Sequence, residues 1–250
     1  MIVFSKTFLI VVSIIFLAPF QYLFVKLNLR LKVYIPKLFH KIVLKVIGIK
    51  VKLIGEYSRL RPLVLIGNHT SYLDIIILGS IMPICFIAKY EIRGWFLFGF
   101  LAKMQNTIFI NRKNQKTLES IKNINKHLKN ESAVVLFPEG TTNTGKKLLD
   151  FKSSLFNMFE NNSILRLQNF SLCYTHVNDM PIDDRTRPQV SWYGDMNMIS
   201  HLTNLLKLSC INVTVVFHKS LPTVGMNRKQ ISSYSYKQVK EGIDLAIDGI

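Results

Sequence analysis

Residues 63–74, Leu63-Val-Leu-Ile-Gly-Asn-His69-Thr-Ser-Tyr-Leu-Asp74, predict a strand, a polar turn and the start of a helix. The first residues are leucine or β-branched, as in a buried strand, and an apolar helical pattern follows the turn. Polar side chains at the end of a strand are where sites often form in α/β folds. The stretch therefore predicts an α/β domain with a candidate site at this turn.

The same alternation of short apolar runs and helical patterns continues along the chain. Strands are expected at Pro62–Gly67, Ile84–Ala88, Thr107–Asn111, Ala133–Phe137, Phe170–Tyr174, Gln189–Tyr193 and Asn212–Phe217. Helices are expected at Ser71–Ile81, Gly94–Met104, Gln115–Lys129, Ser153–Glu160, Ile199–Leu208 and Tyr234–Ile247. This order predicts a mixed, largely buried sheet flanked by helices. Without a repeat or a linker, residues 56–250 are expected to form one domain.

The composition is apolar and basic at the same time. The 250 residues are 49% apolar and only 19% charged, with 32 Lys+Arg against 15 Asp+Glu and a net charge of +17. Such a chain can form a core, which excludes disorder, and its charge indicates a polyanionic partner, either phospholipid or nucleic acid. The three widely spaced cysteines and the scattered histidines predict neither a disulfide framework nor a metal site.

The first 55 residues contain nine Lys/Arg and no acid. Within them, Thr7–Val25 carries no charge over 19 residues, close to the roughly 20 residues that cross a bilayer. We expect a membrane segment; a cleaved signal peptide is disfavoured because no small-x-small cleavage site follows, and a buried helix is the other alternative. Only Lys6 precedes the segment, so the positive-inside rule places the rest of the chain on the cytoplasmic side.

Residues 31–46 follow with a helical stripe of lysines, Lys37, Lys41 and Lys45. Beside a membrane anchor this pattern predicts an interfacial helix whose lysines face anionic headgroups, although a merely solvated surface helix gives the same periodicity. We therefore expect residues 1–55 to form an N-terminal membrane-anchoring helical segment and residues 56–250 a catalytic domain.

The polar turn carries a possible acid–base pair. Thr70 or Ser71 is expected to cap the helix, which puts Asp74 in its first turn within reach of His69. An Asp that holds a His fixes its tautomer and makes it an oriented general base. The alternative is a plain capping turn in which Asp74 only favours the helix dipole.

A second polar segment, Leu136-Phe-Pro-Glu139-Gly140-Thr141-Thr-Asn-Thr-Gly145, follows another strand. Its glycines and hydroxyls suit an anion-binding loop, and Glu139 would then orient a cation, for which Arg112 at the end of its own strand is the candidate. Taken singly, each feature is also typical of an ordinary turn or a solvated arginine.

Together these segments resemble a known family. Gly67-Asn68-His69-Thr-Ser71-Tyr-Leu-Asp74, Thr107-Ile-Phe109-Ile-Asn-Arg112 and Phe137-Pro138-Glu139-Gly140-Thr141 resemble the first three conserved blocks of the glycerolipid acyltransferases typified by bacterial 1-acyl-glycerol-3-phosphate acyltransferase. The resemblance extends over about residues 40–220 and implies an enzyme of a bacterial inner membrane with its catalytic domain on the cytoplasmic side.

The resemblance implies that His69, steadied by Asp74, deprotonates the hydroxyl of a lysolipid, which attacks the thioester of an acyl donor without an acyl-enzyme. The implied donor is acyl-CoA or acyl carrier protein, and no metal or organic cofactor is expected. The residues implied to hold the acceptor are Arg112, Glu139, Gly140 and Thr141, with Lys89 and Lys103 as weaker basic candidates.

Three departures from the family pattern bear on the substrate. Asn106 replaces a common glycine, Leu167–Tyr174 lacks the usual Val-Pro-Val, and Ser191-Trp-Tyr-Gly-Asp195-Met looks more like the branch that makes ornithine lipid. The main prediction is transfer to lysophosphatidic acid, giving phosphatidic acid, with lyso-ornithine lipid as the alternative acceptor.

Two other function classes are weaker. A lipid acyl hydrolase would use Ser71 as its nucleophile, but no Gly-x-Ser-x-Gly elbow surrounds it. A nucleic-acid binder would interleave basic and aromatic residues or show a recognition motif, and the sequence has neither, so membrane phospholipid is the expected polyanionic partner.

Overall fold

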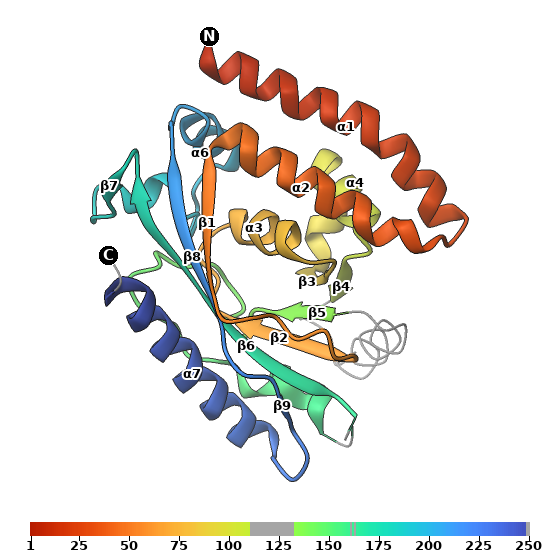
Figure 1. The fold of residues 1–250 in the computed structure, drawn as a ribbon, viewed down its shortest axis with the longest axis vertical. Coiled ribbons are helices and arrows are strands. Elements are labelled where there is room, and N and C mark those ends of the chain that lie inside the picture. The colour runs from red at the N-terminus through yellow and green to blue at the C-terminus, as the bar shows by residue number, and fades with distance from the viewer. Residues whose placement is uncertain (111–132, 161, 163, 249–250) are drawn as a thin grey trace.

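The computed structural model describes residues 1–110, 133–160, 162 and 164–248. These residues form a mixed sheet with helices on both faces and a long N-terminal helix at one side (Figure 1). The expected fold class is confirmed. The strand order is β1 (Ile49–Ile54), β8 (Ile211–Phe217), β6 (Arg166–Val177), β2 (Leu63–Gly67), β5 (Ala133–Leu136), β3 (Cys85–Lys89) and β4 (Ile108–Ile110), and the short β7 (Met180–Pro181) and β9 (Leu221–Pro222) pair with β6.

The central strands are apolar because both of their faces are covered. Every residue of β2 and β5 is buried, and neighbouring strands in this part of the sheet run parallel. The sheet changes direction between β6 and β8, which pair antiparallel, while β8 and β1 are parallel to each other. The polar turns after β2 and β5 therefore leave the same edge of the sheet.

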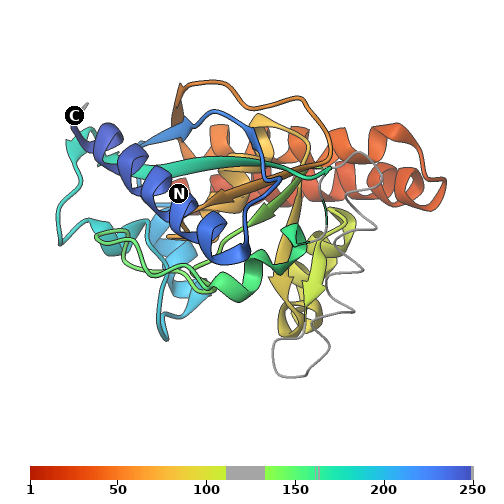
Figure 2. The same cartoon turned by 90° about the horizontal axis from the view of Figure 1, so that it is seen from below.

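Each face of the sheet has its own core. One core contains Leu63 and Leu65 of β2 and the apolar sides of α2 (Tyr34–Ile47), α3 (Leu73–Ile81) and α6 (Met198–Leu205). The other contains Val64 and Ile66, the 3₁₀ segment η3 (Ser153–Phe159) and α7 (Arg228–Asp248). Helix α7 thus covers the opposite face from α2 and α3 (Figures 1 and 2).

Two strand predictions need correction. Gln189–Tyr193 is not a strand: a 3₁₀ turn, η4 (Arg187–Gln189), occupies its start, where Pro188 has no N–H for a ladder. Conversely, Ile49–Ile54 is strand β1, paired with β8, although the sequence analysis assigned it to the anchor region. The sheet therefore begins before the expected domain boundary at residues 55/56.

The helix predictions were mostly confirmed, with shifted ends. Helix α7 begins at Arg228, earlier than expected, because the Asn227 side chain accepts hydrogen bonds from the N–H groups of Lys229 and Gln230. Helix α4 (Phe96–Met104) matches its prediction, whereas Ser153–Phe159 is 3₁₀ helix. The predicted helix Gln115–Lys129 lies outside the described residues.

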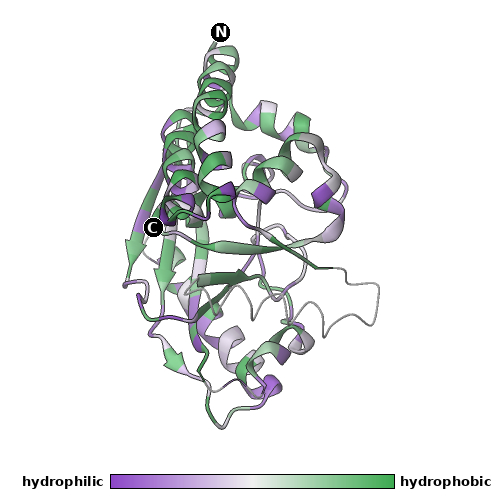
Figure 3. Cartoon of the chain, turned by 90° about the vertical axis from the view of Figure 1, so that its right-hand side faces the viewer, coloured by the Kyte–Doolittle hydropathy of each residue, from purple (hydrophilic) through white to green (hydrophobic). Residues whose placement is uncertain are grey.

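Helix α1 (Ile2–Lys26) is apolar and largely uncovered (Figure 3). It is the one helix among the described residues that is long and apolar enough to cross a membrane, and 6% of its most apolar window is buried. It runs alongside α2, and two polar side chains tie it down. Lys6 Nζ donates to the carbonyls of Ile47 (2.9 Å) and Leu208 (2.7 Å), and Gln21 Nε2 to those of Lys32 (2.8 Å) and Met104 (2.6 Å).

Helix α2 joins α1 to the domain. Its buried side packs on α3, where a Cβ on Gly79 would lie 2.0 Å from Nδ1 of His40. Lys41 and Lys45 are exposed and Lys37 is half-buried, so the lysine stripe lies off the packed face as the periodicity predicted. Whether α1 spans the bilayer stays a prediction.

Candidate active site

The turn between β2 and α3 places His69 against Asp74. Nδ1 of His69 lies 2.8 Å from Oδ2 of Asp74; the Asp74 side chain is fully buried and the His69 side chain is 17% exposed. Because a carboxylate only accepts hydrogen bonds, Nδ1 carries the proton and Nε2 is left free to take one. The structure thus brings together the predicted base and its orienting acid.

Asp74 is held by the turn that it closes. Its Oδ2 also accepts from the N–H groups of Thr70 (2.7 Å) and Ser71 (3.0 Å), and its Oδ1 accepts from the hydroxyl of Tyr174 (2.6 Å). The predicted cap was wrong: α3 begins at Leu73, with Tyr72 before it and no side-chain cap. The Asp74 carboxylate instead reaches back to the N–H groups of Thr70 and Ser71 themselves, whereas a capping side chain at either position would have bound N–H groups two or three residues further on.

The ring of His69 is fixed from a second side by Phe137, the first residue after β5. The two rings stack with centroids 3.9 Å apart and an interplanar angle of 11°. The backbone of His69 is bonded to the same segment, since the N–H of Asn143 donates to its carbonyl at 3.1 Å. The loop after β5 therefore packs directly on the turn after β2.

The buried side chain of Glu139 connects the loop after β5 to the turn after β2. It is 2% exposed; Oε1 accepts from the N–H of His69 (2.7 Å), and Oε2 accepts from the N–H of Leu149 (3.0 Å) and from the side-chain amide of Asn143. Burial raises the pKa of Glu139 to about 7, and the three hydrogen bonds act in the opposite direction. Both carboxylate oxygens are thus engaged by the protein, behind His69.

The rest of this loop bends through two glycines. Gly140 and Gly145 have φ of 75° and 72°, and a Cβ on Gly145 would lie 2.9 Å from Cγ2 of Thr70. Thr141 is exposed next to Gly140. The loop therefore leaves Thr141 accessible to solvent, and its contact with an acceptor stays a prediction.

A second segment, residues 183–192, is joined to this loop by hydrogen bonds and an ion pair. Arg187 Nη1 donates to the carbonyl of Gly145 (3.2 Å), Ser191 Oγ to that of Thr144 (3.0 Å), and Lys146 forms an ion pair with Asp184 (2.8 Å). The N–H of Trp192 donates to the carbonyl of Thr70 at 3.0 Å. The segment that the sequence analysis linked to ornithine lipid thus adjoins the His69 turn.

The remaining predicted residues are placed less fully. Arg112 and the side chain of Lys89 lie outside the described part of the chain. Lys103 is exposed on α4, and its described contacts do not reach the His69 turn. The structure therefore brings together His69, Asp74, Glu139, Gly140 and Thr141, and their expected roles toward a substrate stay predictions.

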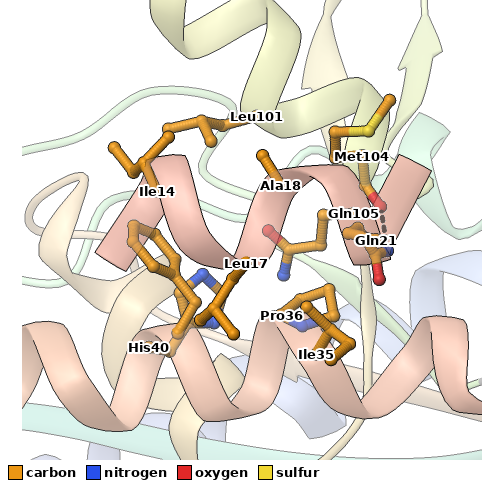
Figure 4. Close-up of a pocket in the computed structure, with 11 residues that line it drawn as sticks. Ile14, Leu17, Ala18, Gln21, Ile35, Pro36, His40, Leu101, Met104 and Gln105 are labelled. Atoms are coloured by element: carbon orange, nitrogen blue, oxygen red, sulfur yellow. Dashed lines mark hydrogen bonds between the residues drawn. The ribbon is translucent and has the colours of Figure 1, made fainter. Parts of the chain in front are cut away.

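An apolar pocket lies elsewhere, between α1, α2 and α4 (Figure 4). His40 lines it, and burial lowers the pKa of His40 to about 4, so its ring is neutral. None of the lining residues belongs to the His69 turn. They are Ile14, Leu17, Ala18, Gln21, Ile35, Pro36, Phe39, His40, Leu101, Met104 and Gln105.

The mixed sheet places the buried Asp74 behind a part-exposed His69, and the Phe-Pro-Glu-Gly loop is hydrogen-bonded to the backbone of that histidine. Residues 49–177 match the protein family described as acyltransferase, and the chain belongs to that family.

Two of the relatives described here are similar over most of their length, and a third is similar over about a third of it. The chain is 34% identical to a lyso-ornithine lipid O-acyltransferase of Brucella abortus over 98% of this chain and 96% of that protein. It is 32% identical to one of Rhizobium meliloti over 93% of this chain and 82% of that protein. A 1-acyl-sn-glycerol-3-phosphate acyltransferase of Neisseria gonorrhoeae is 38% identical over 36% of each chain.

The fold also has a solved counterpart. The crystal structure of the 1-acyl-sn-glycerophosphate acyltransferase of Thermotoga maritima superposes with a TM-score of 0.65 and 20% identity, covering 98% of this chain and 94% of that one. At this identity the likeness concerns the fold.

Proposed function

We propose that this acyltransferase transfers a fatty acyl group to the hydroxyl of lyso-ornithine lipid. The observation that carries the proposal is the extent of the similarity: proteins named for this activity match 93–98% of the chain, whereas the Neisseria lysophosphatidic acid enzyme matches 36%. This reverses the order of acceptors that the sequence analysis predicted.

The His69–Asp74 pair supports the reaction chemically. In the proposed step Nε2 of His69 takes the proton of the acceptor hydroxyl, the oxygen attacks the thioester carbonyl, and an O–C bond replaces the C–S bond. The proton then passes from His69 to the departing thiolate, so the enzyme is regenerated without a covalent intermediate. The proposed donor is acyl-CoA or acyl carrier protein, because both present a thioester.

The charges around the loop after β5 also support a zwitterionic acceptor. Ornithine acylated on one amine keeps a carboxylate and an ammonium, so its binding site needs both signs of charge. Lys146 of this loop and Arg187, Asp183 and Asp184 of the segment 183–192 supply both signs. Gly140, Thr141 and Arg112 remain proposed contacts for the acceptor's anionic group.

Lysophosphatidic acid is the second candidate acceptor. The 38% identity to the Neisseria enzyme favours it. Its phosphate needs concentrated positive charge, for which the sequence offers Arg112, Lys89 and Lys103.

The acceptor is tested with purified protein, a labelled acyl thioester and each lysolipid in turn. We expect label in ornithine lipid and at least a tenfold lower rate into phosphatidic acid. Label that enters only phosphatidic acid would overturn the proposal in favour of the second candidate. A His69→Ala variant in the same assay shows whether either product depends on the site.

The setting is proposed to be the cytoplasmic face of a bacterial inner membrane. The apolar α1 and the exposed lysines of α2 support attachment to an anionic bilayer. Acceptor and enzyme would then share one surface, which spares the lysolipid a passage through water.

A further inference from the structure

One oxygen of Asp74 has no part in the contact with His69. Oδ2 accepts from His69 and from two backbone N–H groups, while Oδ1 points into the protein. Among the described residues, the donor to Oδ1 is the hydroxyl of Tyr174, at 2.6 Å, and both side chains are buried. A buried carboxylate oxygen without a donor is costly, so the Tyr174 hydroxyl satisfies an oxygen that would otherwise destabilise the folded protein.

The position of Tyr174 is fixed relative to the His69 turn by strand β6. Asn68, the residue before His69, donates through Nδ2 to the carbonyl of Leu172 and accepts through Oδ1 from its N–H, both at 2.8 Å. Tyr174 lies two residues further along the strand and points to the same face as Leu172. The amide of Asn68 thus sets the distance between the phenol and the catalytic turn.

Strand β6 is irregular immediately after Tyr174. The pairing of β6 with β8 shifts between Tyr174 and His176, which leaves Thr175 as an extra residue. Such bulges redirect neighbouring side chains and often lie beside active sites. Burial and the negative charge of Asp74 raise the pKa of Tyr174 well above its ordinary value, so the phenol stays protonated and donates.

We propose that Tyr174 is a positioning residue for acyl transfer, whose hydroxyl holds the Asp74 carboxylate in the orientation that serves His69 and takes up part of its negative charge. The proposal rests on the proposed role of His69 and Asp74. Tyr174 touches neither substrate nor the reacting atoms, and it acts through Asp74.

The consequence is measurable in the pH dependence of the reaction. Asp74 stabilises the imidazolium that forms when His69 takes a proton, and a donor on Oδ1 weakens that stabilisation. Without the donor, His69 is protonated at higher pH and is unavailable as a base over a wider acidic range. Glu139, which accepts from the N–H of His69 and whose pKa burial raises to about 7, titrates in the same range, but it is present in wild type and variants alike, so the phenol accounts for the difference between their profiles.

The test compares kcat–pH profiles of two variants. Tyr174→Phe should lower kcat by about tenfold with little change in the acceptor KM, and should move the acidic limb of the profile to higher pH by about half a unit. Tyr174→3-fluorotyrosine keeps the size and the hydroxyl but is a stronger donor, so its acidic limb should move to lower pH.

Two controls separate positioning from packing. Tyr72→Phe removes a neighbouring phenol that bonds Nδ1 of His201 (2.9 Å) and not Asp74, so the acidic limb should stay in place. In an Asp74→Asn background, the Tyr174→Phe exchange should no longer move the acidic limb, because the negative charge through which the phenol acts on the imidazolium is gone.

The outcomes are distinct. Acidic limbs at the wild-type pH in both Tyr174 variants would overturn the proposal, and if Tyr174→Phe does not fold, the fluorotyrosine variant alone decides. A His69→Ala variant that keeps its activity would overturn the proposed function itself. An inactive His69→Ala together with unmoved limbs would overturn only the role of Tyr174.

Discussion

The His69 turn and helix α1 place polar and apolar groups in opposite environments. At the turn, Asp74 and the adjoining Glu139 of the loop after β5 are almost completely buried, and protein donors engage both oxygens of each carboxylate. On α1, Phe4 and Phe16 are 78% and 68% exposed. Buried polar groups in folded proteins are hydrogen-bonded, whereas a large exposed apolar face marks a surface that something else covers.

The difference shows which region has its groups covered within the protein and which region leaves an apolar surface for another partner to cover. In the turn, the Asp74 carboxylate and the N–H groups of His69, Thr70 and Ser71 are satisfied within the protein, and the side chain of His69 is part-exposed. Helix α1 is attached to the domain by Lys6 and Gln21, yet it leaves its outer side uncovered. The account therefore predicts that changes in the turn reduce catalysis and changes on α1 reduce membrane attachment.

Among variants that keep His69, the largest expected effect comes from Asp74→Asn. The asparagine oxygen can still accept from His69, and its amide can donate to Tyr174, so the fold should survive while the negative charge is lost. We expect kcat to fall by about a hundredfold to a thousandfold. A variant that folds normally by circular dichroism and keeps more than a tenth of wild-type kcat would contradict the role of the charge.

Glu139→Gln should have the next largest effect. An amide nitrogen must replace one of two oxygens that accept from backbone N–H groups, which puts two donors face to face beside His69. We expect a roughly tenfold to hundredfold loss of activity and a lower melting temperature. Glu160→Gln, at a partly exposed acid on the protein surface, is the matched control and should change neither.

The same carboxyl predicts a pH dependence of stability. Burial raises the pKa of Glu139 from 4.5 to about 7, so the folded chain holds this proton more tightly than the unfolded chain. Its contribution to stability is therefore complete below about pH 4.5 and is lost as the pH rises through 7, by up to about 3 kcal/mol. Unfolding measured from pH 5 to 8 should show this decline in the wild type and a flatter curve in Glu139→Gln; parallel curves would contradict it.

On α1, Phe16→Ser should weaken membrane attachment without reducing kcat measured in detergent. The side chain is 68% exposed, and placing a phenylalanine in lipid is worth about 2 kcal/mol, or roughly thirtyfold in partitioning. Vesicle flotation measures the change. Unaltered flotation would show that this face of α1 is not the one in contact with lipid.

The smallest effect is expected from Lys6→Met, which keeps the apolar length of the side chain and removes two hydrogen bonds to the carbonyls of Ile47 and Leu208. We expect a loss of about 1–2 kcal/mol in the docking of α1, seen as faster amide exchange at the end of α2. Lys26→Met, at the other end of the helix, serves as the control.

The sequence predicted the parts of the site that depend on contacts between residues close together in the chain. The spacing of His69 and Asp74 on either side of a helix start put the two side chains within reach of each other, and the resemblance to the acyltransferase blocks favoured their contact over a plain capping turn. The orientation of Glu139 was not predictable, since its partners are backbone N–H groups whose directions depend on how two loops pack.

Tyr174 was missed for a related reason. It lies 100 residues from Asp74 in sequence, and a tyrosine in a strand is usually a packing residue. Only the pairing of β6 with β2 brings the two together. Strand β1 was missed because its lysines were interpreted as part of the basic anchor, although Ile49, Val51 and Leu53 alternate with them as in a strand.

The measurement that tests the account most directly is acyl transfer by His69→Ala in vesicles, compared with wild type and with His218→Gln, a histidine that bonds Ser171 on the other face of the sheet. The account predicts at least a thousandfold loss for His69→Ala, with folding and vesicle binding intact, and near wild-type activity for His218→Gln. Retention of more than a tenth of wild-type activity by a folded His69→Ala protein would contradict it.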